Sequence, residues 1–511
     1  MRIPLFKAIR KTKNIKHKKS IIAAVLILVV IFAGISIYQK SGSYYVVFDE
    51  IVPQVQRLNE YNIDVTFYEE EKIIEGKEKV TYVNKTKENI DSIYFHIYPN
   101  VFKTEKTAPF SEEEMDLAYM DGFEPGYINI KSVKSSEGDL SYLVLGKGNS
   151  ILKVNLNEKL EAGDEKVLYI EFMVKIPPAY GRFGRGKKTI NFGNWYPIAA
   201  VLDDSGWNLE PYYPVGDPFY SEVSNYRVAI TMPPNYVVAS TGDLIKKENI
   251  EADYEWTFEA NKVRDFAMIA SDKFKVLEEN VDGINIRSYY FDDNSAELAL
   301  NAAKDAIKIF NEAFGKYPYK HFSVAASDFF IGGMEYPKLV FIDQALYVNK
   351  EFLEYVIVHE TAHQWWYGVV GNDEVEEAWL DESLTEYSTL LYYENKYGKE
   401  DKQKIYNKMI VEGYNKYKDN VKKDEESILR HLQEFNNNRE YHALVYCKGA
   451  MFFEFLRQEL GDEMFFDVLK VYYDKYKYKN ATTEDFIKIC EIVSDRDLKS
   501  MFNQWLTGVG E

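Results

Sequence analysis

The spacing of the apolar residues in this 511-residue sequence changes near the middle of the chain. From about residue 45 to 270, short runs such as 63–68 and 167–172 alternate apolar with polar residues, which is typical of strands. From about residue 295 onward, apolar residues recur every three to four positions, as in amphipathic helices. We therefore expect an α+β fold, with an N-terminal antiparallel β saddle or sandwich domain over residues 40–270 and a mainly α domain over residues 271–511.

The composition of the chain excludes several other classes of protein. Hydrophobic residues make up 46% of the chain and charged residues 28%, which is enough apolar material for large cores and too much for a disordered chain. The formal net charge of −19 argues against nucleic-acid binding, which needs a basic surface. Only two cysteines are present, so an all-cysteine metal site is not possible, and Cys447 and Cys490 either form one disulfide or remain free buried thiols.

Basic residues are concentrated at the N-terminus. Residues 1–40 contain nine Lys or Arg and no Asp or Glu, so the rest of the chain carries a formal charge of −28. The uncharged run Ile21–Tyr38 is 18 residues long, which is enough to cross a bilayer. We expect a basic cytoplasmic tail over residues 1–19, a transmembrane anchor over residues 20–39, and a single-pass protein of the cell membrane. A cleavable signal peptide is the alternative, although its apolar region is usually shorter and Ser36–Gln39 is a poor cleavage site.

A pair of histidines lies on one predicted helix of the second half. His359 and His363 are four residues apart, so both imidazoles project from one helical face and can bind one cation. Glu360, next to the first histidine, is placed to accept a proton from a water molecule that the metal activates. In a chain with seven histidines, chance produces on the order of 0.01 such matches, so the pattern indicates a metal site.

A glutamate further along the chain is the expected third ligand. Zinc hydrolases use three protein ligands and leave a fourth position for water. Glu382 follows His363 by nineteen residues and begins a second amphipathic helix that can lie across the first. The acidic run 373–382 has an alternative interpretation as a solvated negative surface. Glu386, one turn further on the same face, is expected to bind an imidazole N–H and so to orient a ligand.

These residues together resemble the gluzincin zinc aminopeptidases of the aminopeptidase N and leukotriene hydrolase type. Two further motifs are similar to motifs of that family. The first is Gly332-Gly333-Met334-Glu335, which resembles the exopeptidase signature and implies that Glu335 binds the free α-amino group of a substrate. Glycines there leave a backbone edge along which a peptide can pair closely. The second is Tyr446-Cys447-Lys448-Gly449, which implies that the Tyr446 hydroxyl stabilises the oxyanion of the reaction.

The resemblance also implies the domain type, the cofactor and the substrate class. It implies a thermolysin-like catalytic domain after the β domain, one Zn²⁺ per chain, and peptide substrates with a free N-terminus. Tyr336 and Asp381 stand where the family usually has asparagines, and we expect no large helical C-terminal domain.

The predicted function is therefore that of a membrane-anchored zinc metallopeptidase that removes N-terminal residues from peptides, with an extracytoplasmic catalytic domain. Two alternatives stay open. One is a catalytically idle, membrane-tethered relative that binds peptides, and the other is an endopeptidase with a more open cleft. The sequence identifies no protein partner.

Overall fold

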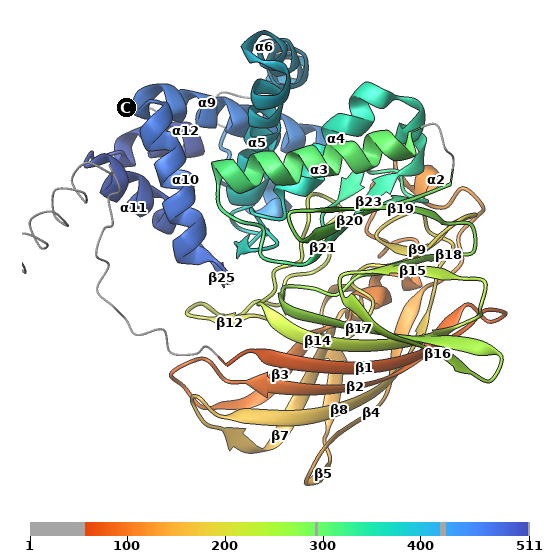
Figure 1. Ribbon diagram of the computed structural model, residues 1–511. Helices are drawn as coiled ribbons and strands as arrows, with labels where there is room; N and C mark the ends of the chain where they lie inside the picture. The colour runs from red at the N-terminus through yellow and green to blue at the C-terminus, as the bar shows by residue number, and fades with distance from the viewer. Residues whose placement is uncertain (1–56, 292–294, 419–425, 509–511) are drawn as a thin grey trace, which may run out of the picture. The chain divides into compact units, whose positions relative to one another are not determined.

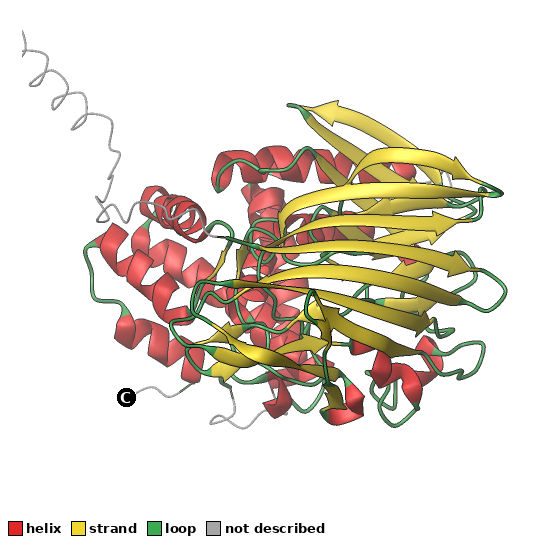
Figure 2. Cartoon of the chain, turned by 90° about the horizontal axis from the view of Figure 1, so that it is seen from below, coloured by secondary structure: helices red, strands yellow, loops and turns green. Residues whose placement is uncertain are grey.

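The structure is a computed structural model that describes residues 57–291, 295–418 and 426–508 (Figure 1). The first part of the described chain forms an eight-stranded sheet, which is the broad layer at the bottom of Figure 1 and lies in front of the helices in Figure 2. In spatial order its strands are β16 (Asp243–Ile250), β17 (Asp253–Val263), β14 (Ser224–Met232), β1 (Asn59–Tyr68), β2 (Ile73–Val83), β8 (Glu165–Lys175), β4 (Tyr127–Ser135) and β5 (Gly138–Asp139).

Strand pairing in this sheet departs from the antiparallel prediction at one place. β1 and β14 pair in parallel, whereas the other neighbours are antiparallel. Tyr61, Ile63 and Val65 of β1 are buried while Asp64 is exposed, because successive side chains of a strand point to opposite faces. This alternation predicts each strand, but it does not determine which strands become neighbours.

Two smaller sheets complete the β domain. One contains β15 (Val237–Ser240), β18 (Met268–Ser271), β10 (Ile190–Phe192) and β9 (Phe183–Arg185), and the other contains β11 (Ile198–Ala199), β3 (Ile90–His96), β7 (Ile151–Leu160) and β6 (Tyr142–Leu145). Shorter elements are η1 (Tyr98–Lys103), α2 (Met115–Ala118), η2 (Lys147–Asn149), and the hairpin of β12 (Leu202–Asp203) and β13 (Gly206–Trp207). One buried apolar core joins the three sheets and extends to Leu339 and Phe341 of the following sheet.

A five-stranded sheet follows, so the second half of the chain does not begin with helices. Its order is β19 (Lys275–Val281), β20 (Ile284–Tyr290), β21 (His321–Ser327), β23 (Leu339–Asp343) and β22 (Gly333–Met334). The three central strands are parallel, and the two outer strands pair with them antiparallel. Every residue of β21 is buried, as expected for a parallel strand that is covered on both faces.

Helices form most of the remaining chain. They are α3 (Ala296–Ala313), η3 (Gln344–Val348), α4 (Lys350–Ala362), α5 (Trp379–Tyr397), α6 (Lys399–Ile405), the π-helix η4 (Tyr406–Val411), α7 (Glu412–Lys418), η6 (Leu432–Glu434), α8 (Asn438–Tyr441), the π-helix η7 (His442–Lys448), α9 (Gly449–Leu460), α10 (Asp462–Tyr476), α11 (Thr483–Ser494) and α12 (Lys499–Thr507). The apolar spacing of residues 450–472 continues across Gly461, where a φ of +81° separates α9 from α10. A short pair of strands, β24 (Val370–Gly371) and β25 (Lys479–Asn480), joins the segment after α4 to the segment after α10.

The predicted fold class is wrong in its membrane component. It included a transmembrane helix, and no helix within the described ranges is both long enough and apolar enough to cross a bilayer. The predicted tail and anchor, residues 1–19 and 20–39, lie outside the described residues. The expectation of a single-pass membrane protein, with a cytoplasmic N-terminus and an extracytoplasmic catalytic domain, is therefore withdrawn.

Candidate metal centre

Helix α4 carries His359 and Glu360 in its last turn, and His363 is the residue that follows its last residue, Ala362. The Asn349 side chain caps its first turn by accepting a hydrogen bond from the Phe352 N–H. Every residue from Leu353 to Ala362 is buried, and the helix packs against α3, α5 and the β22–β23 edge of the five-stranded sheet. The imidazoles at its end therefore face protein groups and not bulk solvent.

Helix α5 supplies the carboxylates. Glu382 lies in its first turn and Glu386 one turn later, and the helix is buried from Trp379 to Tyr393. The indole N–H of Trp366, just after α4, donates to the Ser388 hydroxyl at 3.0 Å and holds the two helices together. The two acidic residues of the first turn, Asp381 and Glu382, lie at the positive end of the helix dipole, which favours negative charge.

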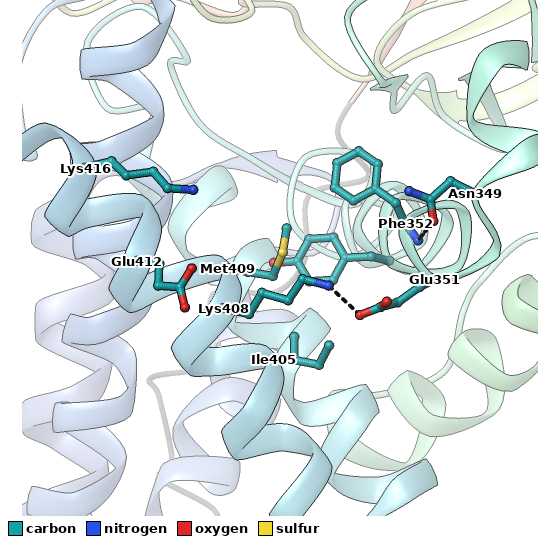
Figure 3. A pocket seen from close by; sticks show the side chains of 9 residues that line it. Asn349, Glu351, Phe352, Ile405, Lys408, Met409, Glu412 and Lys416 are labelled. Atoms are coloured by element: carbon teal, nitrogen blue, oxygen red, sulfur yellow. Dashed lines mark hydrogen bonds and ion pairs between the residues drawn. The ribbon is translucent and has the colours of Figure 1, made fainter.

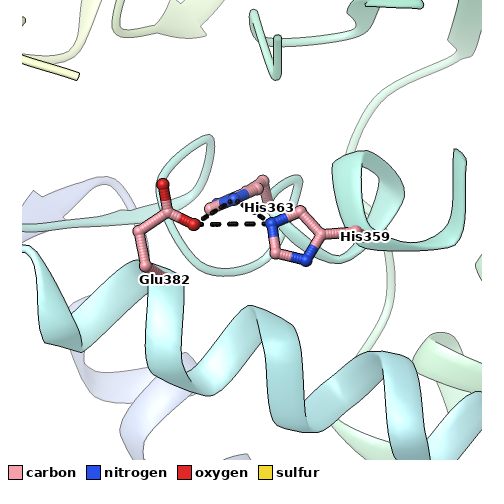
Figure 4. Close-up of side chains that lie close together, drawn as sticks. All are labelled: His359, His363 and Glu382. Carbon is pink, nitrogen blue, oxygen red and sulfur yellow. Dashed lines mark hydrogen bonds and ion pairs between the residues drawn. The ribbon is translucent and has the colours of Figure 1, made fainter. Parts of the chain in front are cut away.

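The three predicted ligands converge on one point (Figure 4). The Nε2 atoms of His359 and His363 are 3.2 Å apart. Oε2 of Glu382 lies 3.4 Å from the first Nε2 and 3.2 Å from the second. Ligand atoms at about 2.0–2.1 Å from a tetrahedral ion lie roughly 3.3 Å from one another, so these separations fit one Zn²⁺ ion.

The positions of the protons also favour a cation at this point. His359 Nδ1 lies 2.8 Å from Oε2 of Glu386, and His363 Nδ1 lies 3.0 Å from the backbone carbonyl of Trp366. A carboxylate and a carbonyl can only accept, so each Nδ1 carries the proton and each neutral ring presents a lone pair at Nε2. Glu382 Oε2 is buried without a hydrogen-bond donor among the described residues. Three lone pairs that face one another repel unless a cation lies between them, and nitrogen and oxygen donors of this kind suit Zn²⁺.

The pKa values of His359 and Glu382 also indicate that this group of side chains attracts positive charge. Burial alone acts to lower the pKa of His359, but Glu382 and Glu386 raise it to about 10. Burial acts to raise the pKa of Glu382, but the neighbouring imidazoles, His363 first, lower it. The cluster therefore favours positive charge, whether from a proton or from a metal ion that replaces it.

Glu386 orients the predicted ligand His359. Its Oε2 accepts from His359 Nδ1, and its Oε1 accepts a short hydrogen bond from the Tyr355 hydroxyl. Tyr355 also lines a separate pocket of about 310 Å³ that contains none of the predicted site residues (Figure 3). Its other lining residues are Asn349, Glu351, Phe352, Ile405, Lys408, Met409, Glu412 and Lys416.

Glu360 and Glu335 lie beside the three predicted metal ligands. Both are buried, and each has one carboxylate oxygen without a hydrogen-bond partner among the described residues. Burial raises the pKa of Glu360 to about 7, and burial followed by the charge of Asp217 raises the pKa of Glu335. A Cβ atom on Gly333 would come within 2.1 Å of Glu360 Oε1, so only glycine permits this approach of β22 to α4.

Tyr446 approaches the cluster from the π-helix η7. Its hydroxyl donates a short hydrogen bond to Glu382 Oε1, and its ring stacks on His359 with centroids 5.6 Å apart. The neighbouring Cys447 is buried and free, as is Cys490, so the two cysteines do not form the disulfide considered above. A π-helix within a helical segment often marks a functional position, and here η7 places the Tyr446 hydroxyl beside the predicted metal ligands.

Asp217 is a residue of the site that the sequence did not reveal. Its carboxylate lies within 4.8 Å of those of Glu335 and Glu382, although it belongs to the β-domain loop before β14. Arg182 forms a buried ion pair with it and also donates from Nε to the Met334 sulfur at 3.0 Å. Both residues reach the site through tertiary contacts from loops without a periodic pattern, so the one available signal was their charge.

Comparisons with known proteins agree with this geometry. Residues 298–505 match the Peptidase family M1 domain. Aminopeptidase N of Lactococcus lactis subsp. lactis is 28% identical over 235 residues, 43% of this chain and 27% of that protein. Aminopeptidase M1-A of Oryza sativa subsp. japonica is 28% identical over 380 residues, 70% of this chain and 42% of that protein. The chain thus spans less than half the length of these curated relatives.

The fold has a solved counterpart. An M1 zinc metallopeptidase from Deinococcus radiodurans superposes with a TM-score of 0.65 and 16% sequence identity, over 89% of this chain and 95% of that one. At that identity the likeness shows the fold alone, a β-rich domain followed by a mainly helical domain. The predicted resemblance to the gluzincin aminopeptidases is confirmed, because residues 298–505 match the Peptidase family M1 domain. This similarity implies Zn²⁺ as the cofactor, as predicted.

Proposed function

We propose that this chain is a zinc-dependent aminopeptidase that removes N-terminal residues from peptides with a free amino group. The observation that carries the proposal is the position of Glu335. Its carboxylate lies within 4.8 Å of the Glu382 carboxylate and is buried with one unpartnered oxygen. A buried carboxylate of this kind is costly unless a cation pairs with it, and the α-ammonium group of a peptide is such a cation.

The ligand set of the zinc ion follows from the directions of the lone pairs. His359 and His363 would bind it through Nε2 and Glu382 through its carboxylate, while Glu386 would hold the His359 ring. When bound, Zn²⁺ supplies a Lewis acid that polarises a carbonyl group and makes a water molecule more acidic.

Glu360 is the proposed general base. Its carboxylate accepts the proton of the attacking water and delivers it to the nitrogen of the departing amine. A pKa that burial raises to about 7 suits this task, because the group can both take up and release a proton near neutral pH.

Tyr446 and β22 are the proposed substrate contacts. The Tyr446 hydroxyl exchanges its bond with Glu382 for one to the developing oxyanion. β22 is at the edge of its sheet, so an extended peptide can pair along Gly332, Gly333 and Met334 while its amino end meets Glu335. The φ of +103° at Gly332 turns the chain into this edge.

The domain division is also a proposal. The sequence predicts a β domain over residues 40–270 and a catalytic domain over residues 271–511, a division that falls within β18, and we place the boundary just after that strand, between β18 and β19. β18 ends at Ser271 within a sheet of the β domain, and β19 begins at Lys275 in the five-stranded sheet.

No observation favours the idle peptide-binding relative or the endopeptidase over the aminopeptidase.

The test is a panel of leucyl and lysyl anilides and peptides, each also prepared with an acetylated N-terminus, assayed on the full chain. We expect cleavage of the free-amine substrates alone, its loss with a chelator and its return with Zn²⁺. Glu360→Gln should bind zinc but show almost no turnover. Glu335→Ala should lose most of its activity on the free-amine substrates. Equal cleavage of free and blocked substrates would identify an endopeptidase, and stoichiometric zinc without turnover would identify an idle relative.

A further inference from the structure

The turn after α4 bonds to the proposed zinc ligand His363 and contains Tyr367, whose backbone conformation is unfavourable by itself. The Trp366 carbonyl accepts the hydrogen bond of His363 Nδ1, with the Thr385 hydroxyl also 3.2 Å from that nitrogen. The next residue, Tyr367, has a φ of +121°, which side chains with a Cβ rarely adopt. Such a conformation persists only where surrounding contacts impose it.

Backbone hydrogen bonds close this turn from within. The Tyr367 N–H donates to the Val370 carbonyl at 2.7 Å, and the Gly368 N–H donates to the His363 carbonyl at 2.8 Å. These bonds leave the Tyr367 carbonyl to be fixed from outside. Its orientation matters, because it fixes the peptide plane between Tyr367 and Gly368. The φ and ψ angles of Tyr367 join that plane to the preceding one, which carries the Trp366 carbonyl.

Arg264, from the β domain, binds that carbonyl. It lies between β17 and β18, is 1% exposed, and donates from Nε to the Tyr367 carbonyl at 2.6 Å. Its Nη atoms donate to the carbonyls of Ser221, at 3.0 Å, and Lys479, at 2.5 Å, and to the Asn480 side chain. One planar guanidinium therefore joins two other parts of the chain, the loop before β14 and strand β25, to the turn.

The partners of Arg264 are unusual for a buried cation. All four acceptors are neutral oxygens, and within the described ranges Arg264 forms no ion pair. A buried charge without a counter-ion is costly, so a fold gains from it only through the geometry that it imposes. The chain also leaves room for it, because a Cβ on Gly371 would come within 2.1 Å of the guanidinium carbon.

We propose that Arg264 is a positioning residue for the metal centre. By binding the Tyr367 carbonyl, it fixes the strained backbone of Tyr367 and so directs the Trp366 carbonyl toward His363 Nδ1. The inference rests on the proposed role of His363 as a zinc ligand. It makes a residue of the β domain, 99 positions before His363 in the sequence, part of the support of the catalytic ion. Groups that orient a ligand in this way typically change metal affinity by about 10- to 100-fold when replaced.

The experiment compares the full chain with Arg264→Lys, Gly371→Ala and the control Asp243→Asn. Lysine cannot make the four bonds, and the alanine Cβ pushes the guanidinium away from the turn. Asp243 bonds to His321 and Lys338 elsewhere on the face between the β domain and the five-stranded sheet, so its variant loses a contact of that face without touching the turn. The zinc dissociation constant is measured by chelator competition, the visible spectrum is recorded with Co²⁺ in place of zinc, and the thermal midpoint is recorded for each protein.

We expect both turn variants to bind zinc about tenfold or more weakly and to show a changed Co²⁺ spectrum, while Asp243→Asn stays within about twofold of the parent. If Arg264→Lys does not fold, Gly371→Ala alone decides the question. Parent-like zinc affinity and Co²⁺ spectra in the turn variants would overturn the proposal and leave Arg264 as a structural contact. A parent protein that binds no stoichiometric zinc would instead refute the proposed function.

Discussion

At the scale of single residues, Glu360 connects the electrostatics of the site to a measurable pH dependence. Burial raises its pKa to about 7, while positive charge nearby, from the imidazoles or from Zn²⁺, acts in the opposite direction. Only the carboxylate can accept a proton, so kcat/KM should rise with pH along an acid limb with its midpoint at or below about 7. A profile of kcat/KM against pH checks this. A rate that falls as pH increases from 4.5 to 7 would contradict the assignment of Glu360 as the base.

Tyr446 offers a second test at this scale, because its hydroxyl now bonds to the ligand Glu382. If it stabilises the oxyanion, Tyr446→Phe should lower kcat by about 10²- to 10³-fold, with zinc affinity close to that of the parent. Steady-state kinetics and zinc titration measure the two quantities separately. Weakened zinc binding with an unchanged kcat per bound zinc would show that Tyr446 orients Glu382 and does not act on the substrate.

At the scale of elements, α5 carries the proposed zinc ligand Glu382 and, one turn later, Glu386, which we propose orients the ligand His359. Glu386→Gln keeps the shape of the side chain but removes the charge that holds His359 Nδ1, so we expect zinc affinity to fall about 10- to 100-fold. Glu394→Gln is the matched control, because Glu394 lies on the same helix but pairs with Arg457 and contacts none of the proposed zinc ligands. Equal zinc dissociation constants for the two variants would remove Glu386 from the site.

Elements also show how far the sequence could predict this protein. The strands of the β domain and the helices with the histidine pair and Glu382 follow local periods, and local periods can be read from sequence. The parallel pairing of β1 with β14, and the approach of Asp217 and Arg264 to the site, depend on contacts between distant parts of the chain. Such contacts leave no periodic trace. The predictions for Glu335 and Tyr446 therefore came from the family resemblance, because no physical pattern in the sequence singles out these two residues.

At the scale of the whole molecule, a buried neutral histidine should make stability fall in acid. Burial lowers the pKa of His96 from 6.5 to about 4, and its one hydrogen bond within the described chain, from Nε2 to the Asn208 carbonyl, opposes this only in part. Because the folded pKa lies below the unfolded value, His96 contributes its full stability above about pH 6.5 and loses it as pH falls toward 4. The contribution is about 3 kcal/mol at most.

The variant His96→Gln keeps a donor for that carbonyl and cannot titrate. Thermal unfolding of both proteins between pH 7 and 4 should therefore show a smaller loss of midpoint in the variant. Parallel curves for the two proteins would mean that acid acts through other groups.

His359, His363 and Glu382 are the proposed ligands of one Zn²⁺ ion. Anomalous diffraction from crystals of the full chain, collected on both sides of the zinc absorption edge, would locate that ion. We expect a single strong peak between the two Nε2 atoms and the Glu382 carboxylate. A peak bound by other residues, or none in crystals grown with zinc, would refute the proposed ligand set.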